Sequence, residues 1–108
     1  MKRNYIFKMD LLILAILSRK DCYGYEIASK ISEESEDSIQ LKEGVMYPIL
    51  HRLMENDLIT SYDMIVGKKI RVYYHIEKKG LDEFEFLKND FETKFKFIQS
   101  IIDRKDME

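Results

Sequence analysis

The chain has 108 residues, of which 45% are hydrophobic and 35% are charged. Such a length predicts one domain with a modest core, since a chain this short buries only about two-thirds of its unfolded surface. The composition is typical of a folded, soluble protein and excludes an intrinsically disordered one. The single cysteine, Cys22, excludes an internal disulfide and favours a reducing compartment, which we expect to be the cytoplasm.

Charge is distributed unevenly along the chain. The net charge of −2 gives no overall attraction to nucleic acid. However, the segment 67–79 contains a single acid, Glu77, and the segment 33–37 is strongly acidic. The basic residues of the first segment are Lys68, Lys69, Arg71, Lys78 and Lys79. Because a DNA-binding protein needs only one positive face, DNA binding remains possible.

The N-terminal region combines basic residues with an apolar run, Leu11–Leu17, and so mimics a signal peptide. The run is too short to span a bilayer, and the polar segment 18–21 offers no small-residue cleavage site. We therefore predict a helix over residues 9–18 and no membrane association. Because this helix lacks a polar face, it should be covered on several sides.

Two further helices are expected. Residues 21–24 resemble a turn, and the helical spacing of Ile27, Ala28 and Ile31 predicts a helix over 25–34. The next helix should begin near Glu43 or Gly44 and end near Asn56. Its proline, Pro48, falls in about the first turn, where a missing N–H costs little.

The pattern then changes to two extended runs, 58–64 and 69–76, separated by residues 65–68. The second run alternates, with Ile70, Val72 and Tyr74 facing one way. Gly67 supplies the turn. We predict a β-hairpin with a basic tip and a basic second strand.

A long helix should fill residues 78 to about 104. One stripe at helical spacing contains Phe84, Leu87, Phe91, Phe95, Ile98, Ile101 and Ile102, whereas Phe86 and Phe97 lie nearly opposite. Such a helix has more apolar surface than its own small domain can cover, and a partner chain is the simplest cover. The expected fold class is α+β, mainly α: a winged helix-turn-helix over residues 1–77 with an added C-terminal dimerisation helix over 78–108, forming one compact unit.

Three blocks of sequence make this winged-helix arrangement more specific. They are Tyr23–Ile27, Gly44–Leu53 with its Tyr47-Pro48 pair, and Val72–Ile76, accompanied by Leu11–Leu17, Leu58-Ile59 and Lys79-Gly80. Over roughly residues 9–82 the chain resembles the PadR family of transcriptional regulators, and its single last helix resembles the smaller branch. The resemblance implies a homodimeric repressor, often ligand-responsive, in which the first and last helices form the dimer.

Departures from the family pattern affect the entrance of the third helix. Val45 lacks the hydroxyl that a family threonine could offer to a phosphate, and Glu43 would repel one. Glu77 replaces the threonine with which the family starts its last helix. We therefore expect Tyr47 and the basic hairpin to contribute more to DNA binding than the start of the third helix.

The candidate DNA contacts come from the third helix and the hairpin. Tyr47 can reach a phosphate or base edge, and Lys42 a phosphate; the alternatives are a core tyrosine and a solvated lysine. One of His51 and Arg52 should face DNA while the other braces the scaffold, for Arg52 through a salt bridge. The hairpin residues predicted to reach a phosphate or the minor groove, unless merely solvated, are Lys68, Lys69 and Arg71.

The candidate dimer contacts follow from the resemblance and from the aromatic faces of the last helix. They are Leu12 and Ala15 on the first helix and Phe86, Phe91, Phe95, Phe97 and Ile98 on the last. Phe86 and Phe97 pack between two chains or, alternatively, line a pocket for a small planar hydrophobic effector. Elsewhere, Tyr73 and Tyr74 should pack at the base of the hairpin, and Tyr25 should brace the second helix against the third.

No catalytic or metal site is predicted, and neither is a cofactor. His51, His75 and Cys22 lack metal-ligand spacing, and no nucleophile stands beside a base. The function that these patterns favour is sequence-specific binding of double-stranded DNA by a homodimeric regulator, with half-sites about one helical turn apart. The alternative is a winged-helix module that binds a protein instead of DNA, which the net acidity, Glu43 and Val45 motivate.

Overall fold

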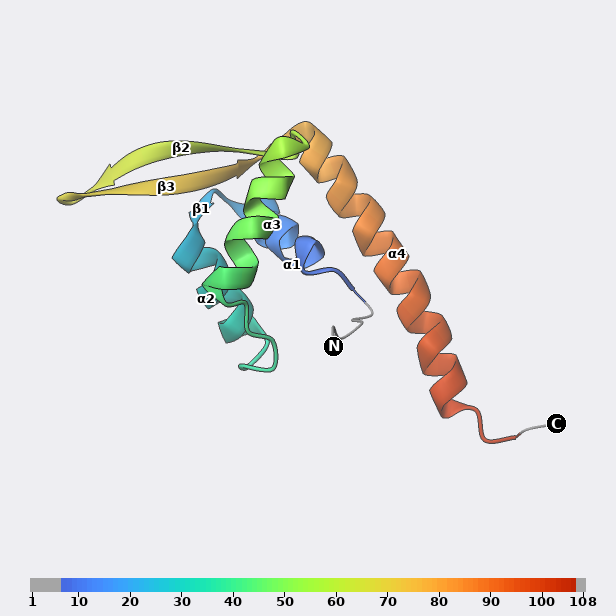
Figure 1. Ribbon diagram of the computed structural model, residues 1–108. Coiled ribbons are helices and arrows are strands. Elements are labelled where there is room, and N and C mark those ends of the chain that lie inside the picture. Colours follow the sequence, from blue (N-terminus) through green and yellow to red (C-terminus); the bar gives the residue numbers. More distant parts are fainter. Residues whose placement is uncertain (1–6, 107–108) are drawn as a thin grey trace.

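The computed structural model describes residues 7–106 (Figure 1). These residues form four helices and a three-stranded antiparallel sheet, so the predicted mainly helical α+β fold is confirmed. In chain order the elements are α1 (Met9–Arg19), β1 (Cys22–Tyr23), α2 (Gly24–Glu34), α3 (Glu43–Glu55), β2 (Ile59–Val66), β3 (Lys69–Ile76) and α4 (Lys78–Asp103).

The core lies where α1, α2 and α3 meet the base of the sheet. Helix α1 is buried on several sides, as predicted, because its residues Leu11, Ile13, Leu14, Ile16 and Leu17 all point into protein. Ile27 of α2 and Leu50 of α3 are also almost fully buried. Each such side chain contributes roughly 1.5–3 kcal/mol through removal of apolar surface from water. The core therefore fixes the orientation of α3 relative to α1 and α2.

Strand β3 is the centre of the sheet, with β1 on one side and β2 on the other. The β2–β3 register runs from Ile59 opposite Ile76 to Val66 opposite Lys69. This pairing leaves a two-residue turn at 67–68, shorter than the predicted separation of 65–68. Gly67 has φ +65°, a left-handed conformation that glycine adopts without steric cost. The hairpin β2–β3 is the wing, and it extends away from the helices (Figure 1).

The segment predicted as a turn before α2 contains strand β1. Cys22 lies opposite Tyr74 and Tyr23 opposite Tyr73, so β1 closes the inner edge of the wing. Two residues are too few to produce an alternating pattern, which is why this strand could not be predicted. Cys22 is buried there, and burial raises the pKa of its thiol. Helix α2 then starts at Gly24, where the carboxylate of Glu26 accepts a hydrogen bond from the Tyr23 N–H at 3.2 Å.

Helix α3 has the predicted extent, but Pro48 lies in its second turn rather than its first. A proline at this position removes the N–H that the Gly44 carbonyl would otherwise accept from. The helix ends beyond Glu55, where Asp57 takes φ +60° and the Leu58 N–H bonds the Leu53 carbonyl at 3.0 Å. This sharp end directs the chain from α3 straight into the wing.

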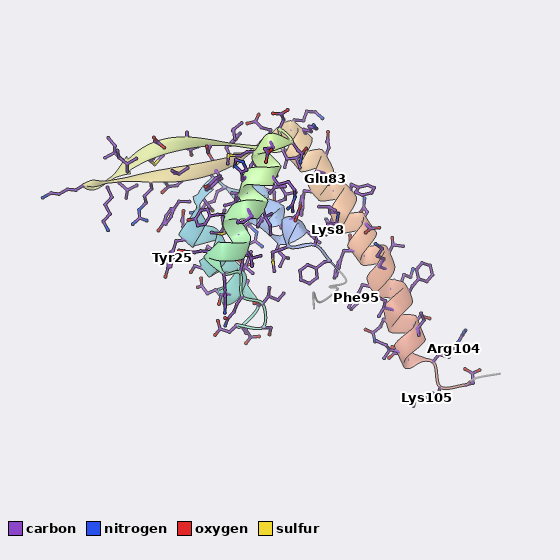
Figure 2. All side chains as sticks on the ribbon, in the orientation of Figure 1. Lys8, Tyr25, Glu83, Phe95, Arg104 and Lys105 are labelled. Carbon is purple, nitrogen blue, oxygen red and sulfur yellow. The ribbon has the colours of Figure 1, made fainter. Side chains whose placement is uncertain are left out.

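Helix α4 starts at the base of the wing, packs along α1 and continues past the rest of the molecule (Figure 1). At its start Gly80 is buried so closely that a Cβ would overlap the carbonyl oxygen of Leu58. Phe84 and Leu87 pack against the core, and Phe91 meets Phe7 edge to face. The C-terminal part of α4 extends away from the other elements (Figures 1 and 2). No helix within residues 7–106 is long and apolar enough to cross a bilayer.

Candidate nucleic-acid interface

Helix α3 presents an exposed face opposite the core. Its buried side chains, Met46, Ile49, Leu50 and Leu53, share one side of the helix. At about 100° per residue the opposite side carries Gly44, Pro48, His51 and Glu55, all exposed. Val45 and Arg52 form one flank of that side, and Tyr47 lies on the other. Lys42 is the exposed residue that precedes the helix, close to where the resemblance places a phosphate.

Tyr47 is part of α3, its side chain points towards the N-terminus of α2, and the residue is 44% exposed. A Cβ built on Gly24 would be 2.6 Å from the Tyr47 hydroxyl, so the absence of a side chain at residue 24 permits this approach. The two residues share a groove of about 280 Å³ with Tyr25, Val72 and Arg71 of the wing. Tyr47 is therefore neither a core tyrosine nor a free one, and its hydroxyl is held in the groove between α3 and the wing.

The structure distinguishes Arg52 from His51, the two candidate DNA contacts in the middle of α3. Arg52 reaches α1, where one guanidinium nitrogen lies 3.2 Å from both carboxylate oxygens of Asp10. His51 is on the outward line, where its Nε2 lies 3.4 Å from the carboxylate of Glu55 in the next turn. Arg52 thus has the bracing position that the sequence left open, and His51 has the outward one.

The Arg52–Asp10 contact gives a prediction that tests whether Arg52 stabilises the fold or contacts DNA. Because the Arg52 side chain is about half exposed, Arg52→Ala and Asp10→Asn should each lower the free energy of unfolding by only about 0.5–1 kcal/mol. Urea unfolding measures this loss, and a double-mutant cycle isolates the pair. The salt dependence of DNA binding should not change with Arg52→Ala. If Arg52→Ala instead reduced the slope of log K against log salt by about one per protomer, Arg52 would be assigned to a phosphate contact.

Three basic side chains distinguish the wing. Lys68 and Lys69 are exposed at the turn, while Arg71 is half-buried with its guanidinium carbon 4.4 Å from the centre of the Tyr23 ring. This cation–π contact holds the Arg71 charge at the edge of the groove shared with Tyr47. The wing thus offers two exposed lysines at its tip and, two residues further along β3, one arginine held on an aromatic ring.

The tyrosines near the wing differ from expectation at one position. Tyr74 is buried, and Tyr73 packs between Tyr62 and Tyr23 with ring centroids 5.8 and 5.5 Å away, as predicted for the base of the wing. Tyr25 was expected to brace α2 against α3, and that expectation is wrong. Its side chain is 69% exposed at the start of α2 (Figure 2), because Gly24 and Tyr47 already fill the space between the two helices.

A polar network, not foreseen from the sequence, fixes the outer face of the wing. The Tyr62 hydroxyl donates to Asp21 at 2.7 Å, and His75 Nδ1 lies 2.8 Å from the other Asp21 oxygen. The second imidazole nitrogen is 3.7 Å from Glu77, which also accepts from the Thr60 hydroxyl. The hydrogen bond to Asp21 raises the pKa of Tyr62 to about 12. Burial raises the pKa of Asp21, but the bonds from Tyr62 and His75 outweigh it and lower the net value.

His75 gives a pH-dependent prediction. Its hydrogen bond to Asp21 raises its pKa; burial opposes the shift, and the negative charges of Asp21 and Glu77 add to it. A raised folded-state pKa means that the charged imidazole favours folding most below about pH 6.5. The contribution is lost as the pH rises through the folded-state value. NMR titration of the imidazole should show a midpoint above 6.5 that falls in Asp21→Asn, and an unchanged midpoint would contradict the network.

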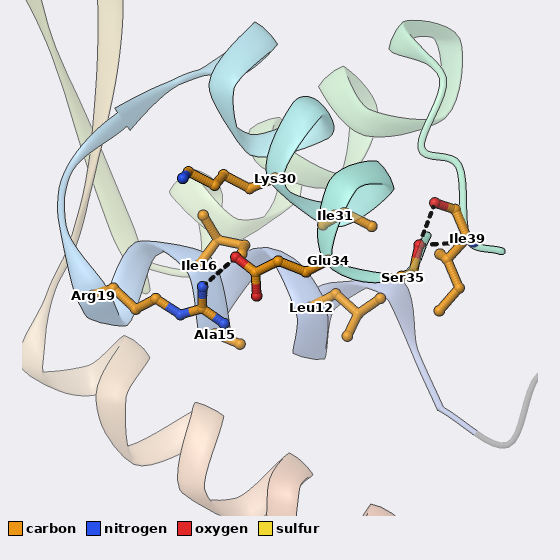
Figure 3. A pocket seen from close by; sticks show the side chains of 9 residues that line it. All are labelled: Leu12, Ala15, Ile16, Arg19, Lys30, Ile31, Glu34, Ser35 and Ile39. Carbon is orange, nitrogen blue, oxygen red and sulfur yellow. Dashed lines mark hydrogen bonds and ion pairs between the residues drawn. The ribbon is translucent and has the colours of Figure 1, made fainter. Parts of the chain in front are cut away.

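The predicted dimer and effector residues do not form one pocket within a single chain. Leu12 and Ala15 line a hollow between α1 and α2, closed at one side by the Arg19–Glu34 ion pair at 2.6 Å (Figure 3). Phe86 and Phe91 line a different hollow of about 350 Å³ beside α1. Phe95 stays near Phe91, at 5.8 Å between ring centroids, whereas Phe97 is exposed and Ile98 half-exposed. Within one chain these residues therefore line two hollows and an exposed helix end, and their predicted roles in a dimer or an effector pocket remain predictions.

Within residues 7–106, no group of three or more histidine, cysteine or acidic side chains is placed to hold a metal ion. The notable features of the surface are instead the outward face of α3, the groove beside Tyr47 and the basic wing. A helix-turn-helix followed by a two-stranded wing, with the second helix of the pair exposed, defines the winged helix-turn-helix class.

The comparison with known proteins narrows this class to a family. Residues 13–85 match the model of the transcriptional regulator PadR-like family, and the chain belongs to that family. PadR family regulators are in general DNA-binding proteins rather than enzymes. The chain is therefore a transcriptional regulator of the PadR family, as its sequence motifs indicated.

Solved structures and a curated relative agree with this assignment. A PadR family transcription regulator from Clostridium difficile R20291 is 38% identical, with a TM-score of 0.76 over 92% of this chain and 99% of that one. A transcriptional regulator from Clostridium thermocellum is 31% identical, with a TM-score of 0.81 over 87% and 92%. The transcriptional regulator YqjI of Escherichia coli K12 is 40% identical over 62 residues, which are 57% of this chain but only 30% of YqjI.

Proposed function

We propose that the chain is a homodimeric, cytoplasmic repressor that binds an inverted-repeat operator in double-stranded DNA. The observation that supports DNA binding most directly is the combination of an outward α3 face with a basic wing, which meet at the groove beside Tyr47. Each α3 would enter one major groove, and half-sites about one helical turn apart would match a two-fold dimer. Lys42, Tyr47 and His51 would contact one half-site, while Lys68, Lys69 and Arg71 reach the flanking backbone.

The proposed dimer rests on the uncovered part of α4. Phe86 and Phe97 are each 65% exposed, and Ile101 and Ile102 more so. A single chain with this much apolar surface on one helix is typical of an interaction site. A second copy would cover it, with α1 contributing Leu12 and Ala15. We treat residues 1–77 as the DNA-binding part and 78–108 as the dimerisation helix.

An effector would act through the same region. The hollow beside Phe86 and Phe91 is mostly apolar and lies between α1 and α4, which the dimer would bring against the partner. A small planar hydrophobic molecule bound there would change the angle between the two recognition helices if it prefers one dimer geometry. Repression would then be relieved or strengthened by the population shift that this preference produces.

A gel-shift assay with the DNA upstream of the chain's own gene tests the proposal, combined with sedimentation to measure the mass of the free protein. We expect a dimer and a salt-sensitive shift. The competing function is a winged-helix module that binds another protein, which the net charge of −2 and the exposed Glu43 favour. A protein complex together with no DNA shift at low salt would support that alternative and reject the repressor.

A further inference from the structure

The exposed face of α3 carries few groups able to read bases by paired hydrogen bonds. The side chains best suited to this are arginine or lysine on guanine and asparagine or glutamine on adenine. Helix α3 contains no asparagine, glutamine or lysine between its first and last residues, and its one arginine is Arg52. Arg52 is bound to Asp10 of α1. Apart from the single hydrogen bond that His51 can offer, direct reading from the helix is therefore left to apolar contacts.

The first two turns of α3 are instead apolar where they face outward. Val45 is 53% exposed, and Pro48 is exposed on the line that leads away from the core. Gly44 lies beside them with no atom within 4 Å of the position its Cβ would take, so nothing keeps a neighbouring surface away. The N-terminal residues of a recognition helix are those that approach base edges most closely. The surface presented there is a small apolar ridge formed by Gly44, Val45 and Pro48.

One group in the major groove matches an apolar ridge, namely the C5-methyl of thymine. We propose that Val45 and Pro48 read thymine methyl groups in each half-site, with Gly44 allowing the close approach. This inference rests on the proposed DNA-binding function and adds the base feature that the helix selects. It also gives a role to Val45, which stands where the family often has threonine. Compared with threonine, valine loses the hydroxyl for a phosphate but presents a second methyl to the groove.

The size of the effect follows from the burial of one methyl-sized group. Removing such a contact lowers affinity about fourfold per half-site, and about 15-fold when both half-sites of a palindrome lose it. Deoxyuridine pairs like thymidine but lacks the methyl, so it removes the contact from the DNA side alone. Val45→Ala removes it from the protein side, and Val45→Thr keeps one γ-methyl.

The experiment measures the affinity of the full chain for a fragment enriched from random DNA, with thymidine replaced by deoxyuridine one position at a time. For the wild type, replacement should cost about fourfold at one or two positions of a half-site. For Val45→Ala the same replacements should cost almost nothing, while Val45→Thr should give an intermediate response. Val66→Ala, an exposed valine of the wing, is the matched control and should keep the full response to deoxyuridine.

The outcomes separate this inference from the function on which it rests. If the wild type and Val45→Ala both bind the fragment well and lose the same affinity on deoxyuridine replacement, methyl reading is rejected. The proposed repressor function is then unaffected. An affinity that is insensitive to every replacement in the wild type would reject methyl reading too. A chain that enriches no fragment at any salt concentration would overturn the proposed function, and methyl reading with it.

Discussion

Replacing Lys68, Lys69 and Arg71 together by alanine is expected to lower DNA affinity on the order of 100-fold near physiological salt. Each cation on a phosphate releases counterions from the DNA, so its loss reduces the slope of log K against log salt by about one. For a dimer the triple variant should therefore lose about six from the slope. The slope is more informative than the affinity, since it counts phosphate contacts independently of base contacts.

The control for this variant removes the same charge elsewhere. Lys30, Lys88 and Lys105 are exposed and lie on α2, along α4 and beyond its end. Their joint replacement by alanine should leave the slope almost unchanged. Because Arg71 also packs on Tyr23, the double variant Lys68→Ala, Lys69→Ala tests the charges without disturbing that contact. Equal slopes for the triple variant and its control would show that the wing does not touch DNA.

A carboxylate placed on the exposed part of α4 should separate the proposed dimer. Phe97 is 65% exposed and Ile101 is 75% exposed, and at four residues apart they are neighbours on the helix surface, so Phe97 lies beside the stripe and not opposite it as predicted. In a dimer either position would be covered, and burying an unpaired charge costs several kcal/mol. We expect Phe97→Glu and Ile101→Glu to sediment as monomers at concentrations where the wild type is a dimer. Operator affinity should then fall on the order of 100-fold, because a monomer binds only one half-site.

Lys96→Glu supplies the matched control on the same turn. At about 100° per residue, Lys96 points away from the apolar arc that contains Phe97 and Ile101. The same new carboxylate should there leave the dimer and the operator affinity unchanged. If Phe97→Glu remains dimeric with normal affinity, the exposed end of α4 is not the dimer surface and another element must join the chains.

The helices and the wing could be predicted because their patterns are long. Helix α4 shows seven apolar residues at helical spacing, and β3 alternates over its whole length. Strand β1 could not be predicted, since its two residues pair only because β3 lies beside them. Pro48 lies one turn deeper in its helix than predicted, since a proline there is disfavoured locally and only the helix as a whole, with Ile49 and Leu50 buried beside it, determines where the helix starts.

The candidate site was predictable as a set of segments but not as a set of contacts. The blocks Gly44–Leu53 and Val72–Ile76 identified α3 and the second strand of the wing, because both match family motifs. The brace between Arg52 and Asp10 joins residues 42 positions apart, and the Asp21–His75 contact joins residues 54 apart. Such distant pairs leave no local pattern in one sequence. For that reason the sequence alone did not distinguish His51 from Arg52.

The central claim is that α3 and the wing together form the DNA-binding surface. NMR titration of the isotopically labelled chain with an enriched DNA fragment tests it most directly, since each backbone amide reports on its own surroundings. We expect the largest shifts at residues 42–51 and 67–71, with small shifts along α4 beyond Phe91. Shifts confined to α4, or none on saturation with DNA, would contradict it.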